Sequence, residues 1–520
     1  MKNTSKILLT LILVIALCLR LSFTVISNEP FSVDSWPLIR IAGKIQENPN
    51  IPIWFDEAFD GYNNHWPGVI LSSLITSVVT SIGLEEIYKF TYVMALNFST
   101  LLLIYVILRN LLNSKSSAIL SLLYFATIPS LLVFTSATLK EVYAYPLFYS
   151  IILLTILPRK GYWRPLIVLS ILALSISMSH HLATVMCIGI LLNTLVVLSI
   201  AKIIGSIQAT SINERYLSAI ITCTSIFFTL YYLVYGRYGF TIPFTLNDAY
   251  LYLIYTIVVY VSYILYLKIG MSKLVVGLSF SIIVLLVSLV PRTSLLPGFP
   301  ALPWDTLLYA IPVILPFTCF LKIFRPKNIV EALIVGMLLV NVINILFISL
   351  AKPELNTVFH RLANYIILMN TMLIAYTWKQ VKLSLRPLIA LIPLITIISG
   401  AIVVYDIITG IDNISYYWFY RKSEVLGLNN VIALSTQEYI IGDAKIRYYT
   451  MLLENTSFIP LKTLMSKSTN LNNALVILYR DNYVKGYIIS LIPYKINIIN
   501  YIVSSSNRVY DNAYINAFTR

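Results

Sequence analysis

Charged residues are scarce in this sequence. They make up 11% of its 520 residues, whereas a soluble domain typically carries about 25%. Hydrophobic residues reach 58% and the mean hydropathy is +0.82, so the chain needs lipid as its solvent. The formal net charge is +15, and the basic residues lie in short clusters between apolar runs. That pattern is typical of membrane topology and excludes a nucleic-acid partner.

Cysteine is also scarce and scattered. Four cysteines fall inside apolar stretches, at Cys18, Cys187, Cys223 and Cys319. Their wide separation excludes a disulfide framework and a cysteine-based metal motif. The sequence also lacks a cleavage site of small residues after its first apolar run, residues 7–26. We therefore expect an uncleaved first helix.

Apolar runs of about 20 residues are abundant, and they predict about thirteen transmembrane helices. The run 68–83 is shorter, and loop charge decides whether it spans. If it does not span, the loops on one side of the membrane hold seventeen Lys and Arg, and the short loops on the other side hold five. The positive-inside rule then predicts a cytoplasmic N-terminus, an extracytoplasmic C-terminus and an interfacial or re-entrant helix at 68–83.

This topology predicts two domains. The first is an all-α polytopic membrane domain over residues 1–408, with a long first outer loop at 28–88. From Thr409 onward polar residues become more frequent, and the strand-like runs 474–480 and 485–490 are separated by turn residues at Asp481-Asn482. We therefore expect residues 409–520 to form a small α/β extracytoplasmic domain.

All four histidines fall on the predicted outer side of the membrane. They are His65, His180, His181 and His360. Ionisable groups gathered at helix ends on one side are candidates for function. The alternative is that histidine simply tolerates membrane interfaces.

Two carboxylates are the main candidates for chemistry. Asp34 follows the first span, where the apolar spacing from Leu38 to Ile45 predicts a short interfacial helix, and Glu141 lies in the next short outer loop. The pair could share a divalent cation such as Mg²⁺ or Mn²⁺, or could divide the roles of acid and base. Alternatively, each carboxylate caps a helix N-terminus.

One arginine begins a predicted span on the same side. Arg361 is the third residue of the apolar run FHRLANYIILMNTMLIAY, residues 359–376. Its planar guanidinium is suited to binding the phosphate of a lipid-linked substrate. It could equally reach the interface as a snorkelling side chain, and the sequence leaves both readings open.

The spacing of these residues resembles that of a known superfamily. Asp34, Trp36 and Arg40 match the motif Asp-Pro-Trp-x-x-x-Arg of the catalytic subunit of oligosaccharyltransferase, a GT-C superfamily glycosyltransferase. Further similarities, in the same order along the chain, are Trp66-Pro67-Gly68-Val69, Ile128-Pro129-Ser130 ahead of Glu141, and Arg361-Leu362. The resemblance covers roughly residues 1–408.

The resemblance implies a polyprenyl-phosphate-linked sugar donor and transfer on the extracytoplasmic face of the membrane. Asp34 is then the general base or a metal ligand, and Glu141 a second acid that shares the cation. Arg361, together with Arg40, is the partner of the donor phosphate. The four histidines remain further candidates for the site.

One hallmark of oligosaccharyltransferase is absent, namely Trp-Trp-Asp-Tyr-Gly. The nearest aromatic run, Tyr416-Tyr417-Trp418, is not followed by Asp-Tyr-Gly. We therefore expect inverting transfer of a single hexosyl or pentosyl unit to a glycolipid, a protein or a cell-envelope polymer. Two alternatives are a transporter or flippase for a lipid-linked saccharide and a non-catalytic GT-C-like scaffold. Spans interrupted by Gly or Pro in two matching halves, which favour a transporter, are not apparent.

Overall fold

The computed structural model describes most of the chain. The described residues are 2–157, 163–205, 214–240, 245–269, 304–317, 326–352, 359–413, 415–434, 439–453, 457–461, 474–488, 493–494, 502 and 506–519. They form two compact units, each assembled from three segments. The first unit comprises Met1–Leu19, Met94–Thr135 and Lys140–Val403, and the second comprises Arg20–Val93, Ser136–Leu139 and Val404–Arg520.

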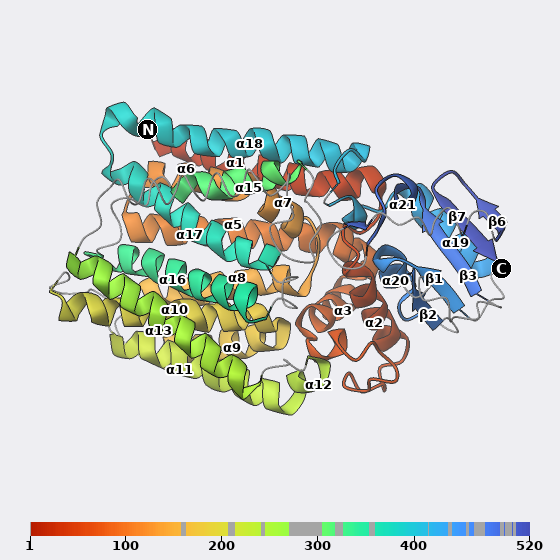
Figure 1. Ribbon diagram of the computed structural model, residues 1–520, viewed down its shortest axis with the longest axis horizontal. Coiled ribbons are helices and arrows are strands. Elements are labelled where there is room, and N and C mark those ends of the chain that lie inside the picture. The colour runs from red at the N-terminus through yellow and green to blue at the C-terminus, as the bar shows by residue number, and fades with distance from the viewer. Residues whose placement is uncertain are drawn as a thin grey trace. The chain divides into compact units, whose positions relative to one another are not determined.

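The first unit is helical, and its long helices lie side by side (Figure 1). Three helices contribute residues to both units: α1 (Lys2–Ser27), α5 (Tyr92–Leu112) and α18 (Arg386–Thr409). The others are α6 (Lys115–Thr127), α7 (Pro129–Thr135), α8 (Lys140–Ile156), α9 (Trp163–Ser179), α10 (His181–Ile203), α11 (Glu214–Tyr231), η3 (Tyr232–Gly236), α12 (Arg237–Gly239), α13 (Leu246–Ile269), α15 (Thr306–Ile314), α16 (Ile329–Leu350), α17 (Phe359–Gln380) and η6 (Leu383–Leu385).

Seven helical stretches among the described residues are long and apolar enough to cross a membrane. They are Thr4–Ser27, Leu84–Leu112, His181–Ile203, Glu214–Gly239, Leu246–Lys268, Ile329–Leu350 and Leu383–Thr409. Helices α6 and α7 make an eighth if their pair, bent by 67°, is one span. One of the apolar runs counted among the thirteen, residues 274–290, lies outside the described residues, so the total of about thirteen stays a prediction.

The long first loop is mostly structured. It holds α2 (Ser35–Glu47), η1 (Asn63–His65), α3 (Gly68–Thr80), α4 (Leu84–Glu86) and the π-helix η2 (Ile87–Thr91). Helix α2 confirms the helix predicted from the apolar spacing, and it buries Leu38, Ile41, Ala42 and Ile45. Helix α3 has 13 residues, fewer than the roughly 20 needed to span a bilayer alone. Its position at the outer interface stays a prediction.

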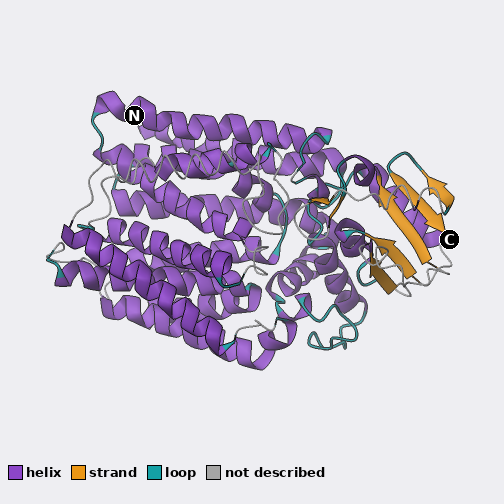
Figure 2. Cartoon of the chain, in the orientation of Figure 1, coloured by secondary structure: helices purple, strands orange, loops and turns teal. Residues whose placement is uncertain are grey.

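The C-terminal segment combines a mixed sheet with short helices (Figure 2). The sheet has five strands in the order β2-β1-β3-β7-β6, with β1 parallel to β2 and β3, and with β7 antiparallel to β3 and β6. The elements are η7 (Tyr416–Trp418), α19 (Lys422–Leu434), β1 (Tyr439–Gly442), α20 (Ala444–Thr450), β2 (Ser457–Pro460), β3 (Ala474–Tyr479), α21 (Arg480–Val484), β4 (Tyr487–Ile488), β5 (Pro493–Tyr494), β6 (Asn507–Asp511) and β7 (Ile515–Thr519). The predicted α/β character is confirmed.

One local prediction in this segment was wrong. Asp481-Asn482 lies in the five-residue helix α21 rather than in a turn. The N–H of Tyr479 donates to Asn482 Oδ1 at 3.0 Å, so the Asn side chain caps the start of the helix.

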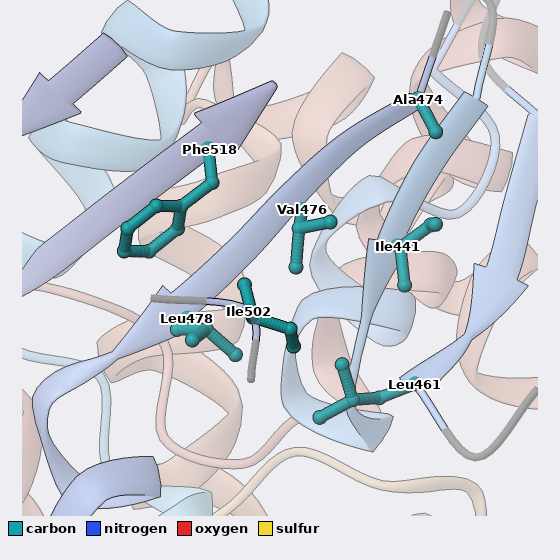
Figure 3. Packing of buried hydrophobic residues seen from close by; sticks show 7 residues of the cluster. All are labelled: Ile441, Leu461, Ala474, Val476, Leu478, Ile502 and Phe518. Atoms are coloured by element: carbon teal, nitrogen blue, oxygen red, sulfur yellow. The ribbon is translucent and has the colours of Figure 1, made fainter. Parts of the chain in front are cut away.

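The sheet has its own apolar core (Figure 3). Ile441 of β1, Val476 and Leu478 of β3 and Phe518 of β7 are all less than 5% exposed and pack together with Leu461, Ala474 and Ile502. Strand β3 is buried along its whole length, which explains its continuous run of apolar residues.

The first loop and the C-terminal segment pack together within the second unit. The N–H of Ser32 donates to the carbonyl of Trp418 at 2.8 Å, and the ring of Phe31 lies edge-on to that of Trp418. Trp36 of α2 contacts Tyr449 of α20 with ring centroids 4.7 Å apart. Aromatic residues from two distant parts of the sequence therefore form one buried cluster.

Candidate functional site

The eight predicted site residues divide between the two units. Glu141, His180, His181, His360 and Arg361 belong to the first unit. Asp34, Arg40 and His65 belong to the second. We therefore describe each group by itself.

Glu141 is the buried centre of the first group. It lies in the first turn of α8 and is 2% exposed. Its Oε1 accepts hydrogen bonds of 3.2 Å from the hydroxyls of Tyr145 on the same helix and Tyr365 on α17. Its Oε2 makes no hydrogen bond to any described residue. The helix N-terminus favours a negative charge here, as the capping reading expected, but the two tyrosines show that the carboxylate also has tertiary partners.

Arg361 lies directly beside this carboxylate. Its Nε is 3.7 Å from Glu141 Oε2, and its side chain is 27% exposed. Asn364, one turn further along α17, donates a 2.9 Å hydrogen bond to the hydroxyl of Tyr145. Residues 361, 364 and 365 thus project from one face of α17 toward the first turn of α8. The guanidinium is held at its Nε edge, while part of the side chain remains accessible.

His180 completes this cluster. It is the N-cap residue of α10, and its Nδ1 accepts a 3.3 Å hydrogen bond from the N–H of Ala183. Its Nε2 lies 3.3 Å from Nη1 of Arg361 and 3.9 Å from Oε2 of Glu141. Burial, reinforced by the neighbouring positive charges, lowers the pKa of His180 well below its usual 6.5. The imidazole is therefore neutral at pH 7.

The other two histidines of the first unit make ring contacts. His181 stacks on His180 with centroids 4.8 Å apart and on Phe240 with centroids 4.5 Å apart. The ring of His360 lies edge-on to Phe134 at 6.2 Å. Of these two, His181 is in direct contact with the cluster of Glu141, His180 and Arg361.

Asp34 occupies the N-cap position of α2 in the second unit. Its side chain makes no capping hydrogen bond, and the residue is partly buried. The neighbouring Ser35 fixes the backbone, because its Oγ lies within 3.2 Å of the carbonyls of Phe31 and Thr138. The capping alternative therefore does not account for the carboxylate of Asp34.

Arg40 and His65 have partners within the second unit. Nη1 of Arg40 donates to the carbonyl of Met451 at 2.7 Å, and its guanidinium lies 5.1 Å from the ring centroid of Tyr449. His65 Nε2 is 2.7 Å from Oδ1 of Asp56. These contacts give Arg40 a structural task that the sequence motif did not indicate, and its role toward a phosphate stays a prediction.

Sequence reasoning missed the polar groups that hold Glu141. Tyr145 follows Glu141 by four residues, and Asn364 and Tyr365 follow Arg361 by three and four, so helical spacing alone was a usable signal. Lys140, which directly precedes Glu141 in the sequence, is a further charged neighbour. It is 8% exposed and close enough to act electrostatically on His180.

The residues around Glu141 do not favour a bound divalent cation. Among the described residues, no three His, Cys, Asp or Glu side chains lie close enough together to hold a metal ion. Glu141 has the guanidinium of Arg361 at 3.7 Å, and a second positive charge beside it would be repelled. These neighbours do not fit Glu141 as a ligand of Mg²⁺ or Mn²⁺.

Comparisons with known proteins identify the fold. No family model matches the chain, and a search of curated proteins finds no relative. Among solved structures, the archaeal oligosaccharyltransferase AglB from Archaeoglobus fulgidus, in complex with an inhibitory peptide and a dolichol-phosphate, aligns over 93% of this chain and 70% of its own, with a TM-score of 0.56 and 11% identity. ArnT from Cupriavidus metallidurans, bound to undecaprenyl phosphate, aligns over 98% of this chain and 97% of its own, with a TM-score of 0.51 and 9% identity. The chain therefore has the fold shared by these two solved proteins, which is the fold that the resemblance in its sequence implied.

Proposed function

We propose that this protein is a membrane glycosyltransferase that takes a sugar from a polyprenyl-phosphate-linked donor. The observation that carries the proposal is the shared fold of two solved proteins, one in complex with dolichol-phosphate and the other with undecaprenyl phosphate. We further propose that transfer takes place on the extracytoplasmic face. The acceptor is a glycolipid, a protein or a polymer of the cell envelope.

Arg361 is the proposed partner of the donor phosphate. A guanidinium binds phosphate oxygens through paired N–H groups in a fixed plane. The contact between its Nε and Glu141 orients that plane, and the 27% exposure of the side chain leaves it open to a ligand. In this proposal the buried carboxylate of Glu141 orients Arg361, and the exposed part of the guanidinium binds the phosphate.

Asp34 is the proposed general base. The acceptor hydroxyl is a weak nucleophile at neutral pH, and a carboxylate can take its proton as it attacks the anomeric carbon. The new bond joins this carbon to the acceptor oxygen, while the bond to the phosphate oxygen breaks and its electron pair leaves with the polyprenyl phosphate. Attack opposite the leaving group inverts the configuration of the sugar.

A divalent cation is the alternative role for Asp34. Mg²⁺ or Mn²⁺ bound to its carboxylate would neutralise charge on the leaving phosphate. The two roles differ in their response to chelation. Transfer that survives EDTA supports the general base, and transfer that is lost with EDTA and restored by Mg²⁺ or Mn²⁺ supports the cation.

The decisive experiment is a transfer assay with the purified protein in membranes. Polyprenyl-phosphate sugars with a radiolabelled sugar are supplied together with envelope lipids, proteins and polymers as acceptors. We expect the label to move from the polyprenyl phosphate to an acceptor fraction. Label that only changes leaflet while it stays on its lipid would support a flippase, and label that neither moves nor changes leaflet would support a scaffold.

A further inference from the structure

The contact between His180 and Arg361 brings two hydrogen-bond donors face to face. The Nδ1 of His180 accepts the N–H of Ala183, so in the neutral ring the proton lies on Nε2. This Nε2 is 3.3 Å from Nη1 of Arg361, which is itself a donor. Neither group can satisfy the other while the cap of α10 is intact.

The carboxylate of Glu141 does not complete the contact for His180. Glu141 Oε2 is 3.9 Å from Nε2 of His180 and 3.7 Å from Nε of Arg361, beyond hydrogen-bond distance from both. This oxygen is buried and makes no hydrogen bond to a described residue. Among the described residues, the Nε2–H of His180 therefore has no acceptor within hydrogen-bond distance, and it lies beside the guanidinium of Arg361.

The local charge favours an anionic acceptor. Arg361 and Lys140 carry two positive charges, Glu141 carries at most one negative charge, and His180 is neutral. The hydroxyls of Tyr145 and Tyr365 already compensate Oε1 of Glu141. A phosphate oxygen that enters along the exposed side of Arg361 therefore meets a net positive environment and displaces no hydrogen bond of Glu141.

We propose that Nε2–H of His180 is a second donor to the phosphate of the lipid-linked substrate, beside Arg361. This proposal rests on the proposed function and assigns it a further binding residue. The backbone of α10 sets the tautomer of His180 through the Ala183 contact. The phosphate oxygen accepts from both helices and resolves the conflict between the two donors.

The test uses a variant that separates the two nitrogens of His180. Asn is a favoured N-cap residue, so His180→Asn keeps the acceptor for Ala183 and removes the Nε2–H. The full-length protein in detergent micelles is titrated with undecaprenyl phosphate, and undecaprenol serves as the uncharged control. Because a hydrogen bond to a charged group is lost, we expect His180→Asn to bind the phosphate about tenfold more weakly, with an unchanged unfolding temperature.

The outcomes separate this inference from the proposed function. Wild-type protein that binds undecaprenyl phosphate no better than undecaprenol contradicts the proposed function itself. If wild type prefers the phosphate and Arg361→Ala loses that preference, but His180→Asn binds like wild type, the assignment of His180 is wrong and the proposed function stands.

A second measurement covers the case in which His180→Asn does not fold. Wild-type protein labelled with ¹⁵N-histidine reports the protonation of each ring nitrogen by NMR, with signals assigned from variants of the other three histidines. We expect His180 to carry its proton on Nε2, and this signal to shift when undecaprenyl phosphate is added. A proton on Nδ1, or an Nε2 signal unmoved by the lipid, would overturn the proposal.

Discussion

Tyr365 of α17 donates a 3.2 Å hydrogen bond to Oε1 of Glu141, the same oxygen that accepts from Tyr145 of α8. The two tyrosine hydroxyls thus hold one buried carboxylate oxygen from two different helices. Since Arg361 lies four residues before Tyr365 on α17, this bond also fixes the turn that carries the guanidinium.

Removal of this hydroxyl tests the link. Tyr365→Phe leaves the ring packing but deprives a buried carboxylate of one partner, which costs about 1–3 kcal/mol in similar cases. We expect a lower unfolding temperature and a KM for the lipid donor that rises severalfold. Tyr149→Phe is the matched control, since its hydroxyl makes no hydrogen bond to Glu141 and its ring is also buried on α8. Equal effects of the two variants would contradict the proposed link.

Asp34→Asn tests the proposed base. The substitution keeps the shape of the side chain and removes its charge, so we expect transfer to fall by at least about 10²-fold while folding changes little. Glu47→Gln removes an exposed carboxylate from the far end of the same helix, and it should leave transfer unchanged. Unchanged transfer by Asp34→Asn would remove Asp34 from the mechanism.

Gly336 of α16 allows a close approach to α10. A Cβ at this position would lie 2.8 Å from the backbone nitrogen of Thr194, which cannot move as a side-chain end can. We expect Gly336→Ala to destabilise the protein by about 1–3 kcal/mol, the usual cost of overpacking. Thermal unfolding in detergent measures the effect. Gly43→Ala places its Cβ in open space on α2 and should cost far less.

Glu29 should make stability depend on pH. Burial raises the pKa of Glu29 from its ordinary 4.5 to about 7, with Lys89 opposing the shift and Glu85 adding to it. Between these two values the folded protein keeps a proton that the unfolded chain has released. The contribution of Glu29 is therefore greatest below pH 4.5, and it is lost as the pH rises to about 7.

The measurement for Glu29 is the unfolding temperature at pH 5 and pH 8. We expect the difference between the two pH values to shrink in Glu29→Gln, because the amide does not titrate. Glu57→Gln, on the exposed part of the same loop, is the control and should behave like wild type. A pH dependence identical in Glu29→Gln and wild type would show that the carboxyl of Glu29 does not titrate in this range.

Orientation in the membrane is the remaining prediction. A reporter fused after Arg520 should report an extracytoplasmic location, and one inserted near Arg325 a cytoplasmic location, because of the bias in loop charge. Protease added to right-side-out vesicles should cleave the C-terminal segment. A fully protected C-terminus would invert the predicted topology.

Patterns within one element predicted that element well. The apolar spacing from Leu38 to Ile45 predicted α2, and the run at 474–480 predicted β3. Contacts between distant residues had no such signal. Arg40 contacts Met451, which is 411 residues away in the sequence, and Glu141 contacts Tyr365, which is 224 residues away. The spacing of the motifs made Arg40 and Glu141 candidates for a functional site, but it did not indicate which neighbours hold them.

The second compact unit draws on both ends of the chain, and this imposes an order on its synthesis. Once the ribosome has made the segment that ends at Val93, it must add roughly 300 residues before the segment from Val404 begins. At about 5–20 residues per second this takes on the order of 15–60 seconds. Throughout that interval Phe31 lacks its contact with Trp418, and Trp36 lacks its contact with Tyr449. The nascent loop must therefore be kept from aggregating until Trp418 and Tyr449 have been made, and the segment that carries Asp34 can reach its final surroundings only after that point.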